Sequence, residues 1–277
     1  MGASREALSA RKGAGRRIDL TIGGVAGLAG GLLGVGGGFV MVPLQTMLAG
    51  RSQHRASGTS LAAIIPIALV GAATYYFGSN TPQTDVTVAV VLGAGAAAGA
   101  LIGALAACRV SDAGLRVLVA VLLVGVGLKE VYDAAGGTAP QLVGTAVPDL
   151  PPSDLAFIAV GGLGIGVLSG LTGVGGGILV VPLLTLGFGI GQRVAQGTSL
   201  LAILPAVAIG AVTRSRSGDV DVRAASWMAA AGVPAALAGS AVALWLPQRA
   251  LGGLFGVFLL FAATRTWPRA QPADKIR

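Results

Sequence analysis

The sequence predicts an all-α polytopic membrane protein with two pseudo-symmetric repeats, each a glycine-broken or re-entrant helix plus three transmembrane helices. Three observations carry this prediction: few charged residues, a series of long apolar segments, and an internal repeat. Charged residues make up 11% of the 277 positions and hydrophobic residues 54%, whereas a soluble domain carries about 25% charge. A chain of this composition requires lipid as its solvent.

Six uninterrupted apolar segments have the length of membrane spans, because a hydrocarbon core of about 30 Å requires about 20 apolar residues. They are Gly58–Phe77, Val86–Cys108, Leu115–Val131, Gly197–Thr213, Ala224–Leu246 and Ala250–Thr264. Two further apolar stretches, Ile18–Ala49 and Leu155–Ile190, are each interrupted by a glycine cluster. The alternative, a large soluble helical core, would need polar outer faces at helical spacing, and Val86–Ala107 is apolar all round.

The basic residues are topology signals rather than a nucleic-acid surface. The net charge is +8, but Lys and Arg stand at the ends of apolar segments without interleaved aromatic residues, so no nucleic-acid partner is expected. The basic start of the chain resembles a signal peptide, but no small-residue cleavage site follows, so we expect it to be retained. With one cysteine and one histidine, we expect no disulfide, no metal site and no cofactor.

The chain repeats itself after 139 residues. This shift places Gly34–Pro66 on Gly173–Pro205 without a gap, and 19 of the 33 positions are identical. A weaker similarity continues with a three-residue shift, which places Asp85 on Asp221. The predicted division is a basic cytoplasmic tail (1–17), repeat 1 (18–132), an extracytoplasmic linker (133–153), repeat 2 (154–265) and a cytoplasmic tail (266–277).

The direction of the second repeat depends on whether the glycine-broken stretches cross the membrane. If both cross, the repeats are parallel, and Lys and Arg divide 13 inside to 6 outside. If both are re-entrant hairpins, the repeats are inverted and the division is 16 to 3. The positive-inside rule favours the second arrangement without excluding the first. Both arrangements leave the two termini in the cytoplasm.

The two glycine clusters, Gly34–Gly38 and Gly173–Gly177, are the first candidates for a site. Irregular backbone is tolerated at membrane depth only where it is buried in protein or lines a water-filled cavity, and glycine permits positive φ and close approach of a guest. The following helices are expected to begin near Phe39 and Ile178, so their free N–H groups would face an anion in the turn. Matching broken helices in two repeats also indicate a transporter's central site.

A second pair of expected helix starts, at Gly58-Thr59-Ser60 and Gly197-Thr198-Ser199, adds hydroxyl groups that can donate to an oxyanion. The predicted substrate-binding residues are Gly36, Gly37, Gly38, Thr59, Ser60, Gly175, Gly176, Gly177, Thr198 and Ser199. Two simpler roles stay open: the glycines could serve only close helix packing, as expected for Gly95, Gly99 and Gly103, and the hydroxyls could only cap helices. Gln45 and Gln196 differ in kind from their repeat counterparts, so any role there would be an asymmetric specificity contact.

No catalytic residue is expected, and the protein is not predicted to be an enzyme. The glycine clusters lack the Gly-Lys-Ser/Thr ending of a phosphate-binding loop, and no acidic residue follows at the distance that a dinucleotide fold requires. Asp and Glu of the apolar region lie at segment ends, so we expect neither paired acids for proteolysis nor a buried carboxylate for proton coupling. This scarcity of acidic ligands also argues against a divalent cation as the transported ion.

At these residues the chain resembles the TauE/SafE sulfite exporter family, also called the toluene-sulfonate uptake permease group. The resemblance rests on the segments GVGGGFVMVPL and GVGGGILVVPL, on the Gly-Thr-Ser-Leu motif after each, and on Asp221–Arg223. It extends from about Ile18 to Arg265, and the segment Thr84–Thr87 departs from it by lacking the arginine. The resemblance implies a multi-pass permease of the inner cell membrane that moves sulfite, an organosulfonate or a related sulfur-containing anion, usually outward.

The expected mechanism is alternating access, in which one repeat rocks against the other and the membrane potential drives export of the anion. The expected partners are this small anion and membrane lipid, and a homo-oligomer stays open. Two rival functions also stay open: an uptake carrier or channel for another solute, and a non-transporting membrane scaffold whose glycines serve only packing.

Overall fold

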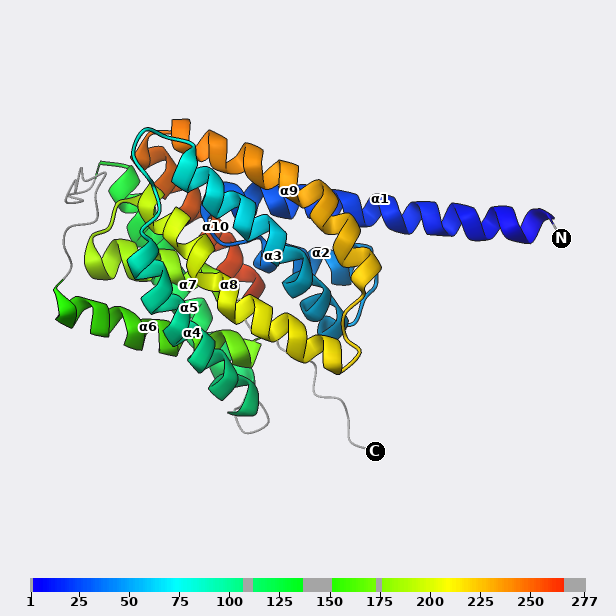
Figure 1. Ribbon diagram of the computed structural model, residues 1–277, viewed down its shortest axis with the longest axis horizontal. Helices are drawn as coiled ribbons and strands as arrows, with labels where there is room; N and C mark the ends of the chain where they lie inside the picture. The colour runs from blue at the N-terminus through cyan, green and yellow to red at the C-terminus, as the bar shows by residue number, and fades with distance from the viewer. Residues whose placement is uncertain (1, 107–111, 137–150, 173–175, 267–277) are drawn as a thin grey trace.

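The computed structural model describes residues 2–106, 112–136, 151–172 and 176–266. Within these ranges the chain is helical apart from short connections and contains no strand (Figure 1). The helices are α1 (Gly2–Leu33), α2 (Gly38–Leu48), α3 (Gln53–Phe77), α4 (Val86–Ala106), α5 (Asp112–Ala134), α6 (Pro152–Thr172), α7 (Gly177–Pro182), η1 (Leu183–Gly187), α8 (Gln192–Arg216), α9 (Val222–Trp245) and α10 (Gln248–Thr266). The all-α prediction is confirmed.

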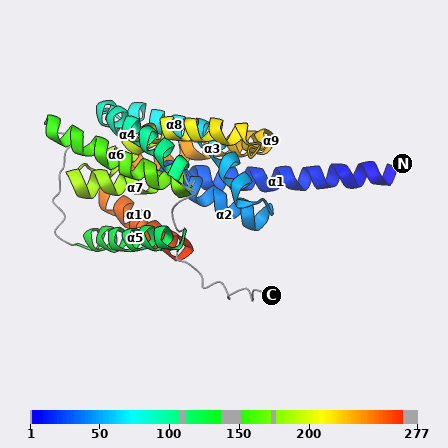
Figure 2. The ribbon, with the colours of Figure 1, turned by 90° about the horizontal axis from the view of Figure 1, so that it is seen from below.

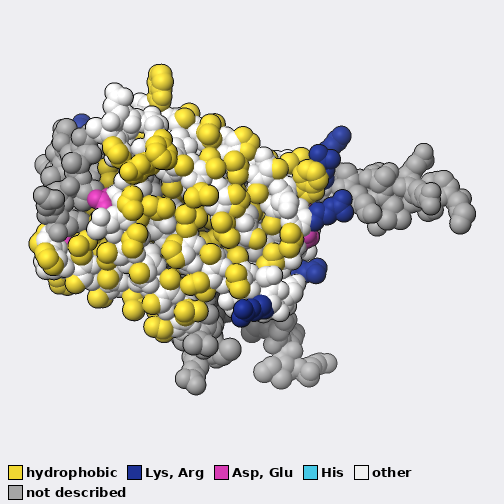
Figure 3. Space-filling model, in the orientation of Figure 1, with side chains coloured by type: hydrophobic (Ala, Val, Ile, Leu, Met, Phe, Trp, Pro, Cys, Tyr) yellow, Lys and Arg dark blue, Asp and Glu magenta, His cyan; other side chains and the backbone are white. Residues whose placement is uncertain are grey.

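Six helices of the described part are long and apolar enough to cross a membrane: α3, α4, α6, α8, α9 and α10. α5 coincides with the predicted span Leu115–Val131 but carries charged residues near both ends, which keeps it outside this group. Apolar side chains such as Val90 and Val257 are exposed on the outer helix faces, and Figure 3 shows a surface covered mainly by hydrophobic side chains. The predicted polytopic membrane protein is therefore confirmed.

Two pairs of corresponding segments in the two halves have the same length, and α3 and α8 run in opposite directions. α3 and α8 each have 25 residues, and α2 has the same extent as the segment Gly177–Gly187 formed by α7 and η1. The three-residue shift of the repeat falls in a loop, because the α3–α4 connection is longer than the α8–α9 connection. In Figure 1, α3 runs from right to left and α8 from left to right.

Each glycine-broken stretch folds back on itself as a hairpin. In the first half, Asp19 of α1 pairs with Arg51, which follows α2, at 2.7 Å between Oδ1 and Nη1. The start and the end of the first glycine-broken stretch therefore lie at the same end of the molecule. In the second half, a Cβ on Gly161 of α6 would lie 2.7 Å from the Leu183 side chain of η1, so η1 packs back along α6. Both contacts agree with the hairpin alternative, in which the two halves are inverted.

The two halves interlock through two glycine-lined helix pairs. α1 packs along α9, and α4 packs along α6 (Figures 1 and 2). A Cβ on Gly27 would strike the backbone of Gly232, and a Cβ on Gly99 would strike the backbone of Leu163. Small residues allow such close backbone approach, which drives helix association in lipid. Gly95, Gly99 and Gly103 therefore have the packing role that their spacing predicts.

Basic side chains gather at one end of the molecule, which we call the basic end. Its described members are Arg16, Arg17, Arg51, Arg55, Arg214, Arg216, Arg223 and Arg265. Figure 3 shows dark blue side chains at this end, from which α1 projects in Figure 1. The opposite end carries Lys129, Arg193 and Arg249 among the described residues. Most of the described basic side chains thus lie at one end of the molecule, as expected for the inverted arrangement.

Candidate functional site

The glycine turns adopt backbone conformations that other residues rarely reach. Gly36 and Gly37 have φ of 71° and 81°, and Gly176 has φ of 66°. α2 begins at Gly38 and α7 at Gly177, within one residue of the expected helix starts. Gly175, which was predicted to bind substrate, lies outside the described residues. As at any helix start, the first N–H groups of α2 and α7 lack an intrahelical acceptor, and the left-handed glycine before each allows the sharp turn into the helix.

The two turns contact each other in the interior. A Cβ on Gly177 would lie 2.9 Å from the backbone oxygen of Val35, which belongs to the other turn. A Cβ on Gly36 would lie 2.7 Å from Ile203 and 3.1 Å from Ile64, which are central residues of α8 and α3. The fold therefore joins segments 139 residues apart in the sequence, and two inward-pointing helix starts meet beside the crossing of α3 and α8.

Gly37 and Gly176 lie on the backs of their own hairpins rather than between the turns. A Cβ on Gly37 would strike the backbone oxygen of Ala26 in α1, and one on Gly176 would lie 2.9 Å from Cβ of Ser169 in α6. A side chain added at either position would therefore disturb the packing of its own hairpin rather than contact a bound anion directly. Gly36 and Gly177 are the positions that face the contact between the turns.

The expectation that Gly58 and Gly197 mark helix starts is wrong. α3 begins at Gln53 and α8 at Gln192, so both Gly-Thr-Ser motifs lie in the second turn of a longer helix. The boundary of the apolar segment had been equated with the helix boundary, but the polar residues before each motif are also helical. A Cβ on Gly197 would strike the backbone of Gln83, and one on Gly58 would lie 2.7 Å from that of Asp219. The glycine of each motif thus allows a loop of the opposite half to pack directly against the helix backbone.

Thr59 and Thr198 hold the helix starts of the opposite half. Thr59 Oγ1 accepts a hydrogen bond from the Asp221 backbone N–H at 3.1 Å, and Thr198 Oγ1 accepts one from the Asp85 N–H at 2.9 Å. Asp221 and Asp85 in turn accept from Ala224 and Val88, which caps α9 and α4. The two threonines therefore act at opposite ends of the molecule, and each hydroxyl keeps one hydrogen to donate.

Ser199 lies at the second glycine turn, and its Oγ donates to the Gly177 backbone oxygen over a long 3.5 Å. Ser60 accepts a hydrogen bond of 2.6 Å from Gln45 Nε2, which also donates to the Ala56 oxygen. The structure thus brings Gly36, Gly177 and Ser199 to the contact between the turns. Ser60 is instead hydrogen-bonded to Gln45 of α2.

Gln196 and Tyr75 form a polar pair next to the first turn. The Gln196 side chain is fully buried, and a Cβ on Gly34 would lie 2.5 Å from Gln196 Cα. The Tyr75 hydroxyl donates to Gln196 Oε1 at 2.9 Å and also lies 3.1 Å from the Gly31 oxygen. Gln196 Nε2 has no partner in the described part of the chain. Tyr75 was missed from the sequence, where it is one of two consecutive tyrosines near a span end and carries no distinguishing signal.

Two carboxylates are buried, contrary to the expectation from the sequence. Asp19 is 5% exposed and Glu130 is 7% exposed. Asp19 pairs with Arg51, and Glu130 Oε1 accepts a hydrogen bond from the Thr185 hydroxyl at 3.1 Å. Their places at segment ends had suggested contact with water, but each is covered by a glycine hairpin. No carboxylate of the described residues is found where the two turns meet.

The comparisons with known proteins agree with this architecture. The family described as sulfite exporter TauE/SafE matches residues 2–130 and 158–277. A "Probable membrane transporter protein YunE" of Bacillus subtilis is 29% identical over 220 residues, which cover 74% of this chain and 80% of that protein. A "Probable membrane transporter protein" of Xylella fastidiosa is 27% identical over 188 residues, covering 67% and 69%. No solved structure matches the chain. The chain therefore belongs to the TauE/SafE sulfite exporter family of membrane transporters.

Proposed function

We propose that this transporter exports a small sulfur-containing anion, such as sulfite or an organosulfonate, through a site between the two glycine turns. The contact between Val35 and Gly177 supports this proposal, because it joins two helix starts at one point of the interior. Helix N-termini favour anions through their free N–H groups and their positive dipole ends. The family to which the chain belongs supports this substrate class.

The polar groups around the turns support an anion rather than a cation. Gln196 Nε2 is an unpaired donor beside the first turn, and Ser199 supplies a hydroxyl beside the second. A buried donor without a partner is costly, so a guest that accepts its hydrogen bond is stabilised. The buried described carboxylates, Asp19 and Glu130, are engaged with Arg51 and Thr185 outside the contact.

The charge distribution supports an orientation with the basic end in the cytoplasm, as the positive-inside rule requires. Inverted halves whose hairpins meet in the interior support alternating access, in which one half rocks against the other around a central site. An inside-negative potential would then drive a monovalent anion outward with about 2.3 kcal/mol per 100 mV.

Gly177→Ala tests the site. The backbone of Gly177 is helical, so alanine fits its φ, but the new Cβ would push against the Val35 oxygen and separate the turns. Gly164→Ala is the matched control, because a Cβ there meets open space on α6. We expect sulfite flux in proteoliposomes to fall at least about tenfold in Gly177→Ala and to be unchanged in the control. Equal flux in both folded variants would contradict the proposed site.

A further inference from the structure

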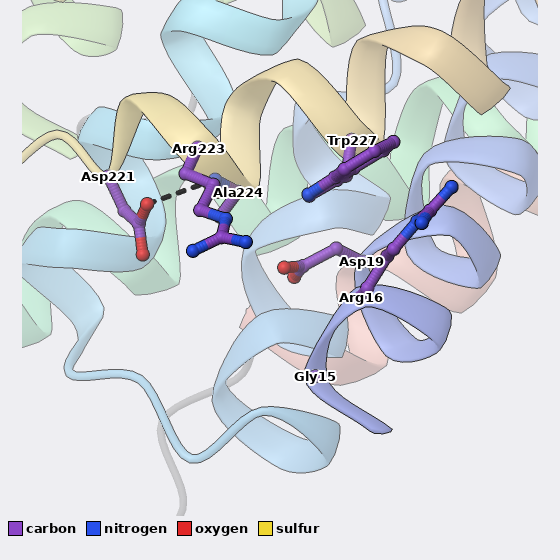
Figure 4. Close-up of a pocket in the computed structure, with 7 residues that line it drawn as sticks. All are labelled: Gly15, Arg16, Asp19, Asp221, Arg223, Ala224 and Trp227. Atoms are coloured by element: carbon purple, nitrogen blue, oxygen red, sulfur yellow. Dashed lines mark hydrogen bonds between the residues drawn. The ribbon is translucent and has the colours of Figure 1, made fainter. Parts of the chain in front are cut away.

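A pocket opens at the basic end between α1 and α9. Its volume is about 330 Å³, and its lining residues are Gly15, Arg16, Asp19, Asp221, Arg223, Ala224 and Trp227. Figure 4 shows the side chains of Arg16, Arg223 and Asp19 around the opening, with the indole of Trp227 along one wall. None of these residues belongs to the contact between the glycine turns.

The two arginines of the pocket are available to an anion. The Arg16 guanidinium stacks over the Trp227 ring at 3.9 Å, which leaves its N–H edges free. Arg223 makes no ion pair or hydrogen bond within the described part of the chain. The acidic groups are already engaged: Asp19 pairs with Arg51, and Asp221 Oδ1 accepts from the Ala224 N–H at 2.9 Å. Guanidinium groups bind oxyanions through paired N–H donors.

A continuous chain of polar contacts leads from this pocket into the interior. Arg51 donates from Nη2 to Asp19 Oδ2 at 3.0 Å and from Nη1 to Gln45 Oε1 at 3.0 Å. Gln45, which is fully buried, donates onward to Ser60 at 2.6 Å. The Asp19–Arg51 pair thus stands between the pocket and the hydroxyl of a predicted substrate-binding residue.

The opposite end of the molecule lacks this chain. The repeat counterparts of Asp19, Arg51 and Gln45 are Ile158, Ile190 and Leu184, and the counterpart of Arg223 is Thr87. The glycine turns and the Thr–Asp contacts occur in both halves, so this asymmetry is not imposed by the shared fold. It indicates a function that only the basic end performs.

We propose that this pocket is the binding vestibule through which a small oxyanion reaches the central site, and that the Asp19–Arg51 pair is its gate. The anion first binds Arg16 and Arg223. It then competes with the Asp19 carboxylate for Arg51, which frees Arg51 from Asp19 and opens the way toward Gln45 and Ser60. This inference rests on the proposed export of an anion and names the first site that the anion meets.

Binding at the pocket can be measured apart from transport, because Trp227 is one of only three tryptophans. In a Trp245→Phe/Trp267→Phe background, sulfite is titrated into protein in phosphatidylcholine nanodiscs at constant ionic strength set by sodium chloride. We expect a saturable change of Trp227 emission. Arg16→Gln and Arg223→Gln should each raise the apparent Kd for sulfite roughly fivefold, which is the upper range for an exposed charge pair. Arg216→Gln, an exposed arginine of the same end, is the matched control.

The outcomes separate this inference from the proposed function. If Gly177→Ala abolishes flux but keeps the sulfite-dependent Trp227 signal, pocket and central site are distinct, as the inference requires. Absence of a saturable signal, or a signal that both arginine variants retain, overturns the vestibule even if transport is intact. A response to phosphatidylglycerol in the nanodisc without a response to sulfite also overturns it, because the pocket would then hold a lipid headgroup.

The gate has its own test. Asp19→Asn removes the charge that the anion must displace, so we expect the apparent KM for sulfite presented at the basic end to fall. Asp219→Asn is the control, because Asp219 is an acid of the same end that lies 4.0 Å from Arg214. An unchanged or higher KM in a folded Asp19→Asn protein would contradict the gate.

Discussion

At the scale of single residues, Gln196 is a buried side chain beside the first glycine turn with a hydrogen-bond donor that has no partner among the described residues. It is fully buried, Tyr75 fixes one end of its amide, and Nε2 has no partner in the described part of the chain. Its repeat counterpart is Ser57. Gly37 and Gly176 share a left-handed backbone before each helix start, but the donors around the two starts differ, which is how an inverted pair of repeats can recognise an asymmetric anion.

Gln196→Glu should weaken transport strongly while keeping the size of the side chain. A carboxylate within about 4 Å of an anion costs on the order of 4 kcal/mol at an effective dielectric constant of about 20. We therefore expect sulfite flux to fall at least about tenfold, as measured in proteoliposomes. Gln53→Glu, at an exposed position of α3, serves as the control. Normal flux in Gln196→Glu would remove this residue from the site.

Thr198 is predicted to act on stability, because its hydroxyl oxygen holds the start of α4. Thr198→Val leaves the Asp85 N–H without its acceptor, which costs about 1–3 kcal/mol for a buried group. Thr198→Ser keeps the oxygen and should restore most of the lost stability. Thermal unfolding in detergent, followed by circular dichroism, distinguishes the two variants, and equal midpoints would contradict this role.

At the scale of helices, the hairpins and the glycine-lined pairs follow from different properties of glycine. The turns use positive φ, whereas the α1–α9 and α4–α6 pairs use the missing Cβ. Gly99→Leu should separate α4 from α6 and cost on the order of 3 kcal/mol, whereas Gly164→Leu on the open face of α6 should cost little. Unfolding midpoints of the two variants test this difference; a similar midpoint for both would contradict the packing role of Gly99.

Much of the helix arrangement could be predicted from the sequence, because apolar length and the 139-residue repeat report it directly. The starts of α2 and α7 were predicted within one residue, since a glycine cluster ends one helix and begins the next. The starts of α3 and α8 were not, because polarity changes inside those helices. The contacts Tyr75–Gln196 and Asp19–Arg51 join distant segments through tertiary folding, and no local pattern encodes them.

At the scale of the whole molecule, the inverted arrangement makes a prediction about sidedness. In the hairpin arrangement Gln53, at the start of α3, lies at the basic end, and Asn80, an exposed residue after α3, lies at the opposite end. If the glycine-broken stretches crossed the membrane instead, Gln53 would lie outside and Asn80 inside the cell. With Cys108 replaced by alanine, we expect an impermeant thiol reagent to label Asn80→Cys but not Gln53→Cys from outside intact cells. The reverse labelling would contradict the inverted arrangement.

The buried carboxylates Asp19 and Glu130 raise the question whether protons or the membrane potential drive transport. Both lie away from the contact between the turns, and Asp19 is held by an arginine. We therefore expect the membrane potential to act on the anion directly. A proton-coupled exporter would instead respond to a pH gradient when the potential is clamped at zero.

The most direct test of the central claim is sulfite efflux from proteoliposomes that contain the purified wild-type protein, with the potential imposed by a potassium gradient and valinomycin. If the protein carries a monovalent anion electrogenically, an interior potential of about −100 mV should shift the limiting sulfite distribution outward by roughly fiftyfold, the equivalent of about 2.3 kcal/mol. Efflux no faster than from protein-free liposomes at any potential or pH gradient would contradict sulfite export.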